Sequence, residues 1–535
     1  MSFDRSLTFD SLLQELNDFG LYQVKTVLLL CLPAAFLNAW QFFDLVFLLY
    51  APDKSCQNWN TNLTIIQDTL GNVSDECEYE GREIGIGLQD RATLHCENWT
   101  SDTRYFDDTV QTQWGLCQDQ LLYKNILGIF TIVGIIGLAI MSVVQDIIGR
   151  KWTFFIMLTL CEIGCGFSLL APSLAVWIVV RNIQMTQSTT TYSLPFIWAQ
   201  EFVGPEKRTL VNFLMALSYS LATVSLGLVA WACHNWIRLG IATVVPFLFF
   251  YSYYFLLDES PRWLLSVGKV EQATKVIEKM AKWNKKTIDL TKLRNKVQVI
   301  SYSASQQESG TNKFPLLDLF RFPNLRTKVL LLTVVWIANS LVYSSLAFNA
   351  PNLGNLFVAY IAQASVEAPA CVFNVLLSNR IGRILPIVLS MLWSSFFCFL
   401  CLPAYVQDWN EWYVIIFAAL AKFGICISFN ILYQATGELY PTSVRCTGFG
   451  VNNFMADLVI GAMPYILDTA NTAKWIPMLI MGVITFVGAV CCAFLPEPMN
   501  QTMPQVALEA EKVSKAGVEQ VKHHAKNLIG CKAFG

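Results

Sequence analysis

The sequence contains little charge for its length. Charged residues make up 14% of the 535 residues, whereas an average soluble domain carries about 25%. A disordered chain is excluded, because disorder requires low hydrophobicity together with many charges. Lysine and arginine number 37 against 39 aspartates and glutamates, so the chain lacks the basic excess typical of nucleic-acid binding.

Motifs of catalysis and energy coupling are also missing. The chain has no Gly-x-x-x-x-Gly-Lys-Ser/Thr loop, which argues against a self-contained ATP-driven pump. It has no His-Glu-x-x-His or Gly-x-Ser-x-Gly pattern, and its four histidines do not group with metal-ligand spacing. We therefore expect no enzyme, no metal site and no cofactor.

Apolar residues, in contrast, make up 54% of the chain, and the mean hydropathy is +0.45. A helix that crosses a bilayer needs about 20 mostly apolar residues. Twelve runs meet this requirement: 26–50, 122–147, 152–171, 174–200, 210–232, 237–257, 329–348, 355–377, 385–404, 412–436, 447–468 and 475–495. The alternation expected of barrel strands is absent, so the sequence predicts an all-α integral membrane protein.

The charges of the loops predict which side each one occupies. The short turns at 149–151 and 380–383 are basic, and short basic turns lie on the cytoplasmic side. The long loop at 258–328 is also basic and becomes a cytoplasmic linker, whereas the acidic loop at 51–120 lies outside. The same assignment places two further segments in the cytoplasm: 1–25 and 496–535.

The predicted outer loop carries features of a glycosylated and oxidising compartment. Its three Asn-x-Ser/Thr acceptors are Asn62, Asn72 and Asn98. Four of the sixteen cysteines also lie there: Cys56, Cys77, Cys96 and Cys117. Four cysteines in an extracellular loop predict two disulfides, for which three connectivities remain open.

Three motifs recur in the two halves of the chain in the same order. Asp146, Gly149 and Arg150 recur as Asn379, Gly382 and Arg383; Glu201 and Arg208 recur as Glu438 and Arg445; Glu259 recurs as Glu497. The separations (379−146, 438−201 and 497−259) are 233, 237 and 238 residues. This near-constant offset indicates duplication of a six-helix unit. The halves, 26–257 and 329–495, then run in parallel, as in the major facilitator fold.

Longer signatures carry a resemblance to a known family. Glu259-Ser-Pro-Arg-Trp263-Leu-Leu265 follows the sixth span, and Glu438-Leu-Tyr-Pro-Thr442 with Arg445 follows the tenth. With the cysteine-bearing loop after the first span, the chain resembles the organic ion transporters of solute carrier family 22. The resemblance implies a major facilitator fold in the plasma membrane. It also implies a set of gating residues: Asp146, Gly149, Arg150, Glu201, Arg208, Glu259, Arg262, Arg383, Glu438 and Arg445.

Acidic residues within the spans are the main indication of substrate charge. A charge at mid-membrane costs about 2.5–3.5 kcal/mol on insertion scales, so it must face a cavity or a partner. Asp457 lies near the middle of the eleventh span and Glu367 near the middle of the eighth. The resemblance implies an acid at the position of Asp457 in cation carriers. The alternative is that Asp457 pairs with a base such as Lys422 and only holds helices together.

Aromatic and amide side chains complete the predicted cavity. Protonated and quaternary amines bind aromatic faces, each worth roughly 0.5–2 kcal/mol. The resemblance and helical spacing give the remaining predicted substrate-binding residues: Tyr192, Trp336, Tyr343, Phe429, Asn430, Asn38 and Gln41. Asp44 continues the polar stripe of the first span and is expected near the outer mouth, where it would concentrate cations.

The sequence therefore predicts a polyspecific carrier of small organic cations that works by alternating access. With no coupling motif visible, facilitated diffusion driven by the membrane potential is the default. Membrane lipids are expected partners, and nucleic acid is not. The alternatives are a zwitterion carrier of the carnitine type or an organic anion carrier, with or without ion coupling. In those carriers Lys422 and Arg181 would matter more.

Overall fold

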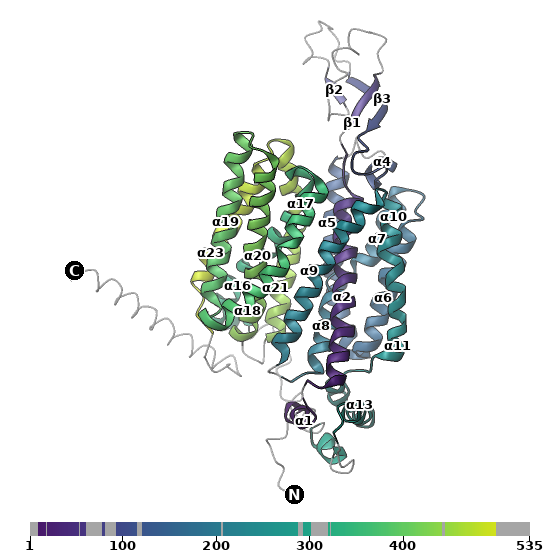
Figure 1. The fold of residues 1–535 in the computed structure, drawn as a ribbon, viewed down its shortest axis with the longest axis vertical. Helices are drawn as coiled ribbons and strands as arrows, with labels where there is room; N and C mark the ends of the chain where they lie inside the picture. The colour runs from purple at the N-terminus through teal and green to yellow at the C-terminus, as the bar shows by residue number, and fades with distance from the viewer. Residues whose placement is uncertain are drawn as a thin grey trace, which may run out of the picture.

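The computed structural model is a helical bundle with a small sheet beyond one end (Figure 1). The described residues run from 9 to 498. Ten gaps interrupt them: 18, 53, 60–77, 81–92, 115–119, 205–206, 287–292, 301–318, 322 and 441–444.

The helices of the N-terminal half follow the first six predicted spans. In chain order they are α2 (Leu21–Leu48), α5 (Gln120–Ile148), α6 (Arg150–Ser168), α7 (Leu174–Met185), α8 (Thr190–Glu201), α9 (Arg208–Cys233), α10 (Trp236–Val244), the 3₁₀ helix η2 (Val245–Ser252) and α11 (Tyr253–Leu256). Four described helices lie outside this bundle: α1 (Phe9–Glu15) before α2, α4 (Val110–Gln113) before α5, and α12 (Pro261–Ser266) and α13 (Val270–Trp283) after α11.

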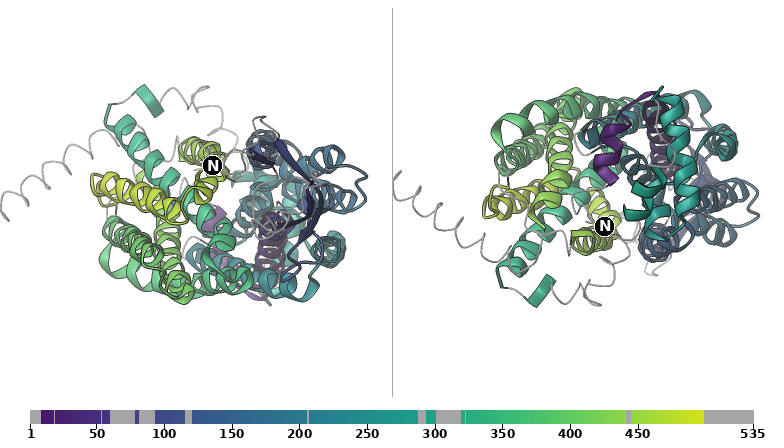
Figure 2. Two further views of the ribbon diagram at one scale, coloured as in Figure 1. Left: turned by 90° about the horizontal axis from the view of Figure 1, so that it is seen from above. Right: turned by 90° about the horizontal axis from the view of Figure 1, so that it is seen from below.

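The C-terminal half follows the last six predicted spans. Its helices are α16 (Pro323–Phe348), η3 (Ala350–Leu353), α17 (Leu356–Ser365), α18 (Glu367–Ile381), α19 (Ile384–Val406), α20 (Glu411–Leu439), α21 (Arg445–Ile460), α22 (Met463–Asp468), η5 (Thr469–Asn471) and α23 (Ile476–Ala493). Viewed along the helices, the two halves lie side by side as separate groups (Figure 2).

Each predicted span corresponds to one helix or to helices in series. Nine helical segments of the described chain are long and apolar enough to cross a membrane by length and composition. The other three spans are α6, which contains three charged residues, and the interrupted pairs α7–α8 and α21–α22. The second interruption has a local cause, because Gly461 precedes it and Pro464 stands in the first turn of α22.

Helices α1 (Phe9–Glu15), α12 and α13 lie at one end of the N-terminal half, which we call the linker end (Figure 1). Helix α13 buries one side, including Ile277 and Met280, in a hydrophobic cluster that also contains Phe9 and Leu13 of α1. This apolar stripe at helical spacing explains why the polar linker folds against the bundle.

A three-stranded antiparallel sheet lies at the opposite end, the loop end, within the loop predicted at 51–120 (Figure 1). The strands are β1 (Lys54–Trp59), β2 (Glu78–Glu80) and β3 (Thr93–Ser101), in the order β1-β3-β2. This sheet is an addition to the predicted all-helical architecture. Cys56 lies on β1, and Cys96 and Asn98 lie on β3. Four other predicted residues fall outside the described chain: Asn62, Asn72, Cys77 and Cys117.

The repeated motifs form matching structures at the linker end. The guanidinium of Arg150 donates to Glu201 at 3.0 Å, and that of Arg383 donates to Glu438 at 3.1 Å. The backbone N–H of Arg150 donates to Glu259 at 3.0 Å, and that of Arg383 donates to Glu497 at 2.7 Å. A carboxylate therefore accepts from the first N–H groups of α6 and of α19, where the helix dipole favours negative charge.

Each carboxylate cap depends on the glycine before the helix. Gly149 and Gly382 have φ angles of +107° and +106°, which side chains with a Cβ rarely adopt. Burial raises the pKa of the Glu259 carboxyl above its ordinary range, and the N–H donors around it oppose that rise. The duplication inferred from the sequence is thus visible as two copies of one hydrogen-bonded arrangement.

The remaining predicted gating residues fall into three groups. Asp146 is exposed and lies 3.1 Å from Arg150, one turn along the chain. Arg262 donates from Nε to the carbonyl of Glu201 at 3.2 Å. Arg208 and Arg445 begin α9 and α21, and the Arg208 side chain is half-buried. The described motif contacts lie within one half each, so they stiffen the halves separately in this conformation.

We predict that Gly149→Ala lowers the melting temperature of the detergent-purified protein more than Gly268→Ala does. An added Cβ at Gly149 would lie 2.5 Å from Glu259 and 2.9 Å from Trp263, whereas at Gly268 nothing lies within 4 Å. Both glycines have positive φ, so both changes share a strain cost of about 1–3 kcal/mol. Equal melting temperatures for the two variants would show that the carboxylate cap contributes nothing to the stability of the fold.

Candidate functional site

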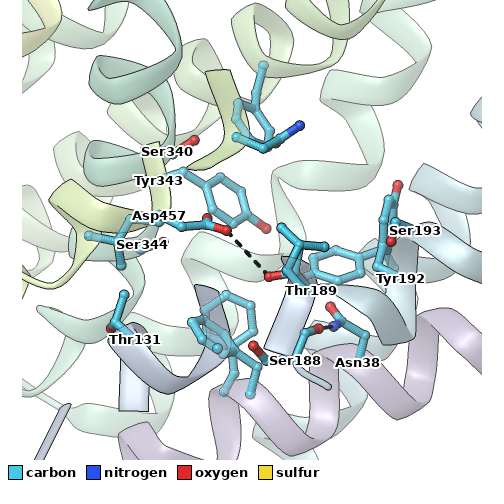
Figure 3. A pocket seen from close by; sticks show the side chains of 18 of the residues that line it. Asn38, Thr131, Ser188, Thr189, Tyr192, Ser193, Ser340, Tyr343, Ser344 and Asp457 are labelled. Atoms are coloured by element: carbon cyan, nitrogen blue, oxygen red, sulfur yellow. Dashed lines mark hydrogen bonds between the residues drawn. The ribbon is translucent and has the colours of Figure 1, made fainter. Parts of the chain in front are cut away.

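A cavity of about 580 Å³ lies between the two halves, near the middle of the bundle. The N-terminal half lines it with α2, α5, α8 and α9, and the C-terminal half with α16, α18, α20 and α21. Figure 3 shows side chains from both halves pointing into this space. A space of this size accommodates a small organic molecule.

Asp457 of α21 faces the cavity (Figure 3). The hydroxyl of Thr189 donates to Oδ2 of Asp457 at 3.5 Å, the long limit of a hydrogen bond, and this contact crosses between the halves. Within the described residues no ion pair to Asp457 is formed. Asp457 is therefore a carboxylate that borders open space without a basic partner in the described chain.

Glu367, the first residue of α18, also borders the cavity but has several partners. The hydroxyl of Tyr343 donates to it at 2.9 Å, and that of Thr223 at 3.4 Å. The Lys422 ammonium lies 3.7 Å from the same carboxylate. The base named in the alternative interpretation thus pairs with Glu367 and not with Asp457, so that alternative is wrong about the partner.

Lys422 is held behind the wall of the main cavity. It is buried, and its ammonium lies 3.2 Å from the centre of the Tyr343 ring. It also donates to the Tyr343 carbonyl at 2.8 Å. A cation enclosed by a carboxylate, an aromatic face and a carbonyl is satisfied locally. Lys422 is accordingly absent from the residues that line the main cavity.

Aromatic side chains form much of the cavity wall. Tyr343 and Phe429 stack with ring centres 5.7 Å apart, and both line the cavity. On the facing half, Tyr192 and Tyr219 meet edge to face at 5.6 Å. Asn430, also predicted, lines the cavity beside Phe429. The structure therefore brings these predicted residues together around one space.

Trp336 takes a different position from the one predicted. It is fully buried, packs on Phe429 and Tyr433, and donates its indole N–H to Thr436 at 3.0 Å. It supports the cavity wall from behind and does not line the cavity. The face of α16 that lines the cavity passes through Ser340 and Tyr343. The predicted face, which included Trp336, is therefore rotated slightly about the helix axis from the observed one.

The polar residues of α2 do not all face the cavity, and some face the interior of the N-terminal half. Asn38 lines the cavity, and its amide donates to the Ser188 carbonyl and to the Thr191 hydroxyl. Gln41, one turn on, is buried and does not line the cavity; its backbone carbonyl accepts from Arg181 at 3.1 Å. The Asn38 contacts satisfy the backbone where α7 and α8 are interrupted.

Asp44 is not at an open mouth, contrary to expectation. It is fully buried and forms an ion pair with Arg181, which is also buried. Because each charge neutralises the other, neither is available to a substrate in this conformation. Asp44 therefore holds α2 to α7 and does not concentrate cations.

Aromatic contacts join the two halves at the loop end. Phe47 of α2 lies 4.8 Å from Tyr360 and 6.0 Å from Phe357 of α17, measured between ring centres. Phe106, which precedes α4, adds a contact to Phe357 at 5.6 Å. These rings pack the two halves against each other at the loop end.

Several lining residues were missed by the sequence reading. Asn453 stands one helical turn before Asp457, and Ser340 and Ser344 flank Tyr343 on α16. Helical spacing around the acid and the tyrosine was a signal that could have found them. Phe43 and Tyr433 lacked such a signal, because aromatic residues make up 13% of the chain.

Comparisons with known proteins agree with this geometry. A sequence profile described as "Sugar (and other) transporter" matches residues 86–509. The chain is 29% identical to "Organic cation transporter 1" of Caenorhabditis elegans, over 96% of this chain and 90% of that protein. It is 29% identical to the "Beta-alanine transporter" of Drosophila melanogaster, over 95% and 90%. Against "Solute carrier family 22 member 2" of Rattus norvegicus the identity is 25%, over 95% and 96%.

Solved structures give the same architecture. The proton:xylose symporter XylE of the major facilitator superfamily, bound to 6-bromo-6-deoxy-D-glucose, superposes with a TM-score of 0.61. The match covers 90% of this chain and 98% of that chain at 13% sequence identity, so the likeness concerns the fold alone. The predicted major facilitator fold is confirmed.

We predict that Asp44→Asn destabilises the protein strongly, whereas Asp457→Asn does not. The first change leaves Arg181 buried without a counter-charge, which costs about 3–5 kcal/mol, and the second removes no described ion pair. The measurement is the melting temperature and the yield of monodisperse protein. The double variant Asp44→Asn/Arg181→Met should recover much of the loss, and a strictly additive double variant would contradict the pairing.

Proposed function

The chain belongs to the sugar and other transporter family of the major facilitator superfamily, and from this we propose that it carries small organic cations across the plasma membrane. The observation that carries the proposal is Asp457, a carboxylate facing a cavity with no described basic partner. A carboxylate in a low-dielectric cavity favours binding of a positive group. Two related proteins are named as organic cation transporters.

The charges around the cavity support a cationic substrate. Among the described lining residues only Asp457 and Glu367 are charged. Arg181 and Lys422, the bases that an anion carrier would use, are buried in ion pairs with Asp44 and Glu367. An anion would therefore meet negative potential in the cavity, unless one of those pairs first separated.

The aromatic wall supports the same substrate class. Tyr192, Tyr343 and Phe429 present rings to the cavity, and a quaternary or protonated amine gains roughly 0.5–2 kcal/mol from each well-placed ring. Two pairs of rings face each other across the cavity and impose no fixed pattern of hydrogen bonds. Substrates of different shape can therefore bind between them. This supports polyspecific binding in preference to recognition of one compound.

A zwitterion is the second candidate, because one relative is named as a transporter of beta-alanine. Its ammonium group would bind Asp457 as a simple cation does. Its carboxylate would need hydrogen-bond donors, and Ser340, Ser344 and Asn453 supply hydroxyl and amide groups around the same cavity.

Alternating access is the proposed mechanism. Contacts such as Phe47 with Tyr360 join the halves at the loop end, and each half is stiffened separately by its own arginine–glutamate pair at the linker end. We assign the loop end to the outside and the linker end, with both termini, to the cytoplasm. This conformation then corresponds to a carrier closed toward the outside, with the cavity between two rigid halves that rock.

We predict that Asp457→Asn reduces uptake of tetraethylammonium by tenfold or more in cells with matched surface expression. A charge-assisted contact contributes about 1.5–3 kcal/mol, which corresponds to roughly ten- to a hundredfold in binding. Asp457→Glu is the matched control and should retain most of the uptake, because it keeps the charge. Carnitine, beta-alanine and an aryl carboxylate complete the panel. Aryl carboxylate uptake that the asparagine variant leaves unchanged would overturn the cation proposal.

We also predict that uptake of a permanent cation slows when the membrane is depolarised. A single charge gains about 2.3 kcal/mol for each 100 mV of inward potential, so a potential-driven carrier loses most of its gradient in high external potassium. The measurement is initial uptake at clamped potentials. Uptake independent of voltage would contradict net transfer of a cation, and acceleration on depolarisation would indicate an anion.

A further inference from the structure

Three lysines from separate elements converge on one short segment at the linker end. Lys25 lies on α2, Lys151 on α6 and Lys279 on α13, and all three contact the stretch Tyr254–Asp258. Their Nζ atoms have the following partners: the Leu256 carbonyl at 3.3 Å for Lys25, the Tyr254 carbonyl at 2.7 Å for Lys151, and the Asp258 carboxylate at 2.6 Å for Lys279.

These contacts leave the lysines able to bind a further group. An ammonium has three N–H donors, and each contact described uses one of them. None of the three side chains is fully buried. Asp258 also accepts from the Tyr22 hydroxyl at 2.7 Å, so its charge is shared between two donors. Three lysines thus lie near two carboxylates, Asp258 and Glu259, so the cluster keeps a net positive charge.

The position of the cluster corresponds to the boundary between lipid tails and headgroups. The outer side of η2 and α11 is apolar, and Phe249 and Phe255 are exposed by 70% and 84%. Side chains of this kind on a membrane-spanning segment face lipid. The apolar run ends at Leu257, and the lysines lie directly there. Lysines at the end of a lipid-facing helix place their ammonium groups at headgroup depth.

Aromatic rings at the same level support this placement. Trp152, Tyr254 and Trp283 are all exposed. The Lys25 ammonium lies 4.7 Å from the centre of the Trp283 ring, and the Lys151 ammonium lies 4.6 Å from that of Tyr254. Exposed tryptophan and tyrosine beside lysine are typical of the membrane interface.

The internal repeat shows that the Lys151 side chain is not needed for the helix cap. Lys151 follows Arg150 in the first half, and the corresponding residue after Arg383 in the second half is Ile384. The backbone N–H of Ile384 still donates to Glu497, as that of Lys151 does to Glu259. The helix cap therefore forms without the lysine side chain, which is free for another role.

We infer that Lys25, Lys151 and Lys279 form a binding site for the headgroup of an anionic phospholipid, with phosphatidylserine as the proposed occupant. The charge of the cluster, its depth and its aromatic neighbours each match a phosphodiester at the bilayer surface. A lipid held there would bridge α2, α6 and the linker helix α13. It would thereby fix the linker end of the N-terminal half to one leaflet.

The test is native mass spectrometry of the detergent-purified full chain, titrated with phosphatidylserine or phosphatidylcholine of the same acyl chains. The test variant is Lys25→Gln/Lys151→Gln/Lys279→Gln. A matched control removes three positive charges from the same end of the other half, Arg321→Gln/Arg326→Gln/Arg380→Gln, whose side chains are all exposed. A third variant, with arginine at the three lysine positions, keeps the charge and tests folding.

We expect the wild type, the arginine variant and the matched control to bind phosphatidylserine at least tenfold more tightly than phosphatidylcholine. The glutamine variant should lose that preference, since each surface lysine contributes about fivefold. Equal loss in the matched control would show a general charge effect and overturn the site. Unchanged lipid binding in the glutamine variant would show that these lysines only cap helix ends, and would also overturn it. Neither result depends on which substrate is carried.

Discussion

A charge inside a bundle of membrane helices is expected to be paired or to face a water-filled space, and this requirement accounts for three acids of the described interior, Asp44, Glu367 and Asp457. Arg181 and Asp44 neutralise each other within the N-terminal half, and Lys422 and Glu367 do so within the C-terminal half. Each pair also ties two helices of its own half together. Asp457 is the acid in the cavity for which the described chain provides only a long hydroxyl contact. The proposed cationic substrate therefore rests on the acid of the cavity wall that the described helices leave without a counter-charge.

The contacts within each half differ in kind from the contacts between the halves. Within each half, an arginine and two carboxylates join the ends of several helices, and the positive-φ glycines Gly149 and Gly382 allow the backbone to reach them. Between the halves, the described contacts include aromatic rings at the loop end and the hydroxyl contacts of Thr189 with Asp457 and of Thr223 with Glu367. Ring contacts are less directional than charge-assisted hydrogen bonds, so the interface between the halves is the easier one to rearrange.

The sequence predicted the fold well, because membrane helices and repeated motifs leave strong local signals. Three features can be recognised in the sequence without tertiary information: the lengths of the spans, the basic turns and the glutamates at a constant offset. Site residues were harder to predict, because their roles depend on rotation about a helix axis. Asp457 and Tyr343 line the cavity, whereas Trp336 and Gln41, on the same helices as cavity residues, face the interior. One residue of rotation turns a side chain by about 100°.

Asp44 illustrates what periodicity alone cannot resolve. Its spacing from Asn38 predicted a continuous polar stripe toward an open mouth, yet the structure places Arg181 opposite it. Arg181 lies 137 residues from Asp44 in the sequence, so the residues around Asp44 give no indication of this partner. The same limit applied to Lys422, whose acid lies on a neighbouring helix. Which charged residues pair within the bundle, and which one borders the cavity without a counter-charge, is therefore tertiary information that the sequence pattern does not contain.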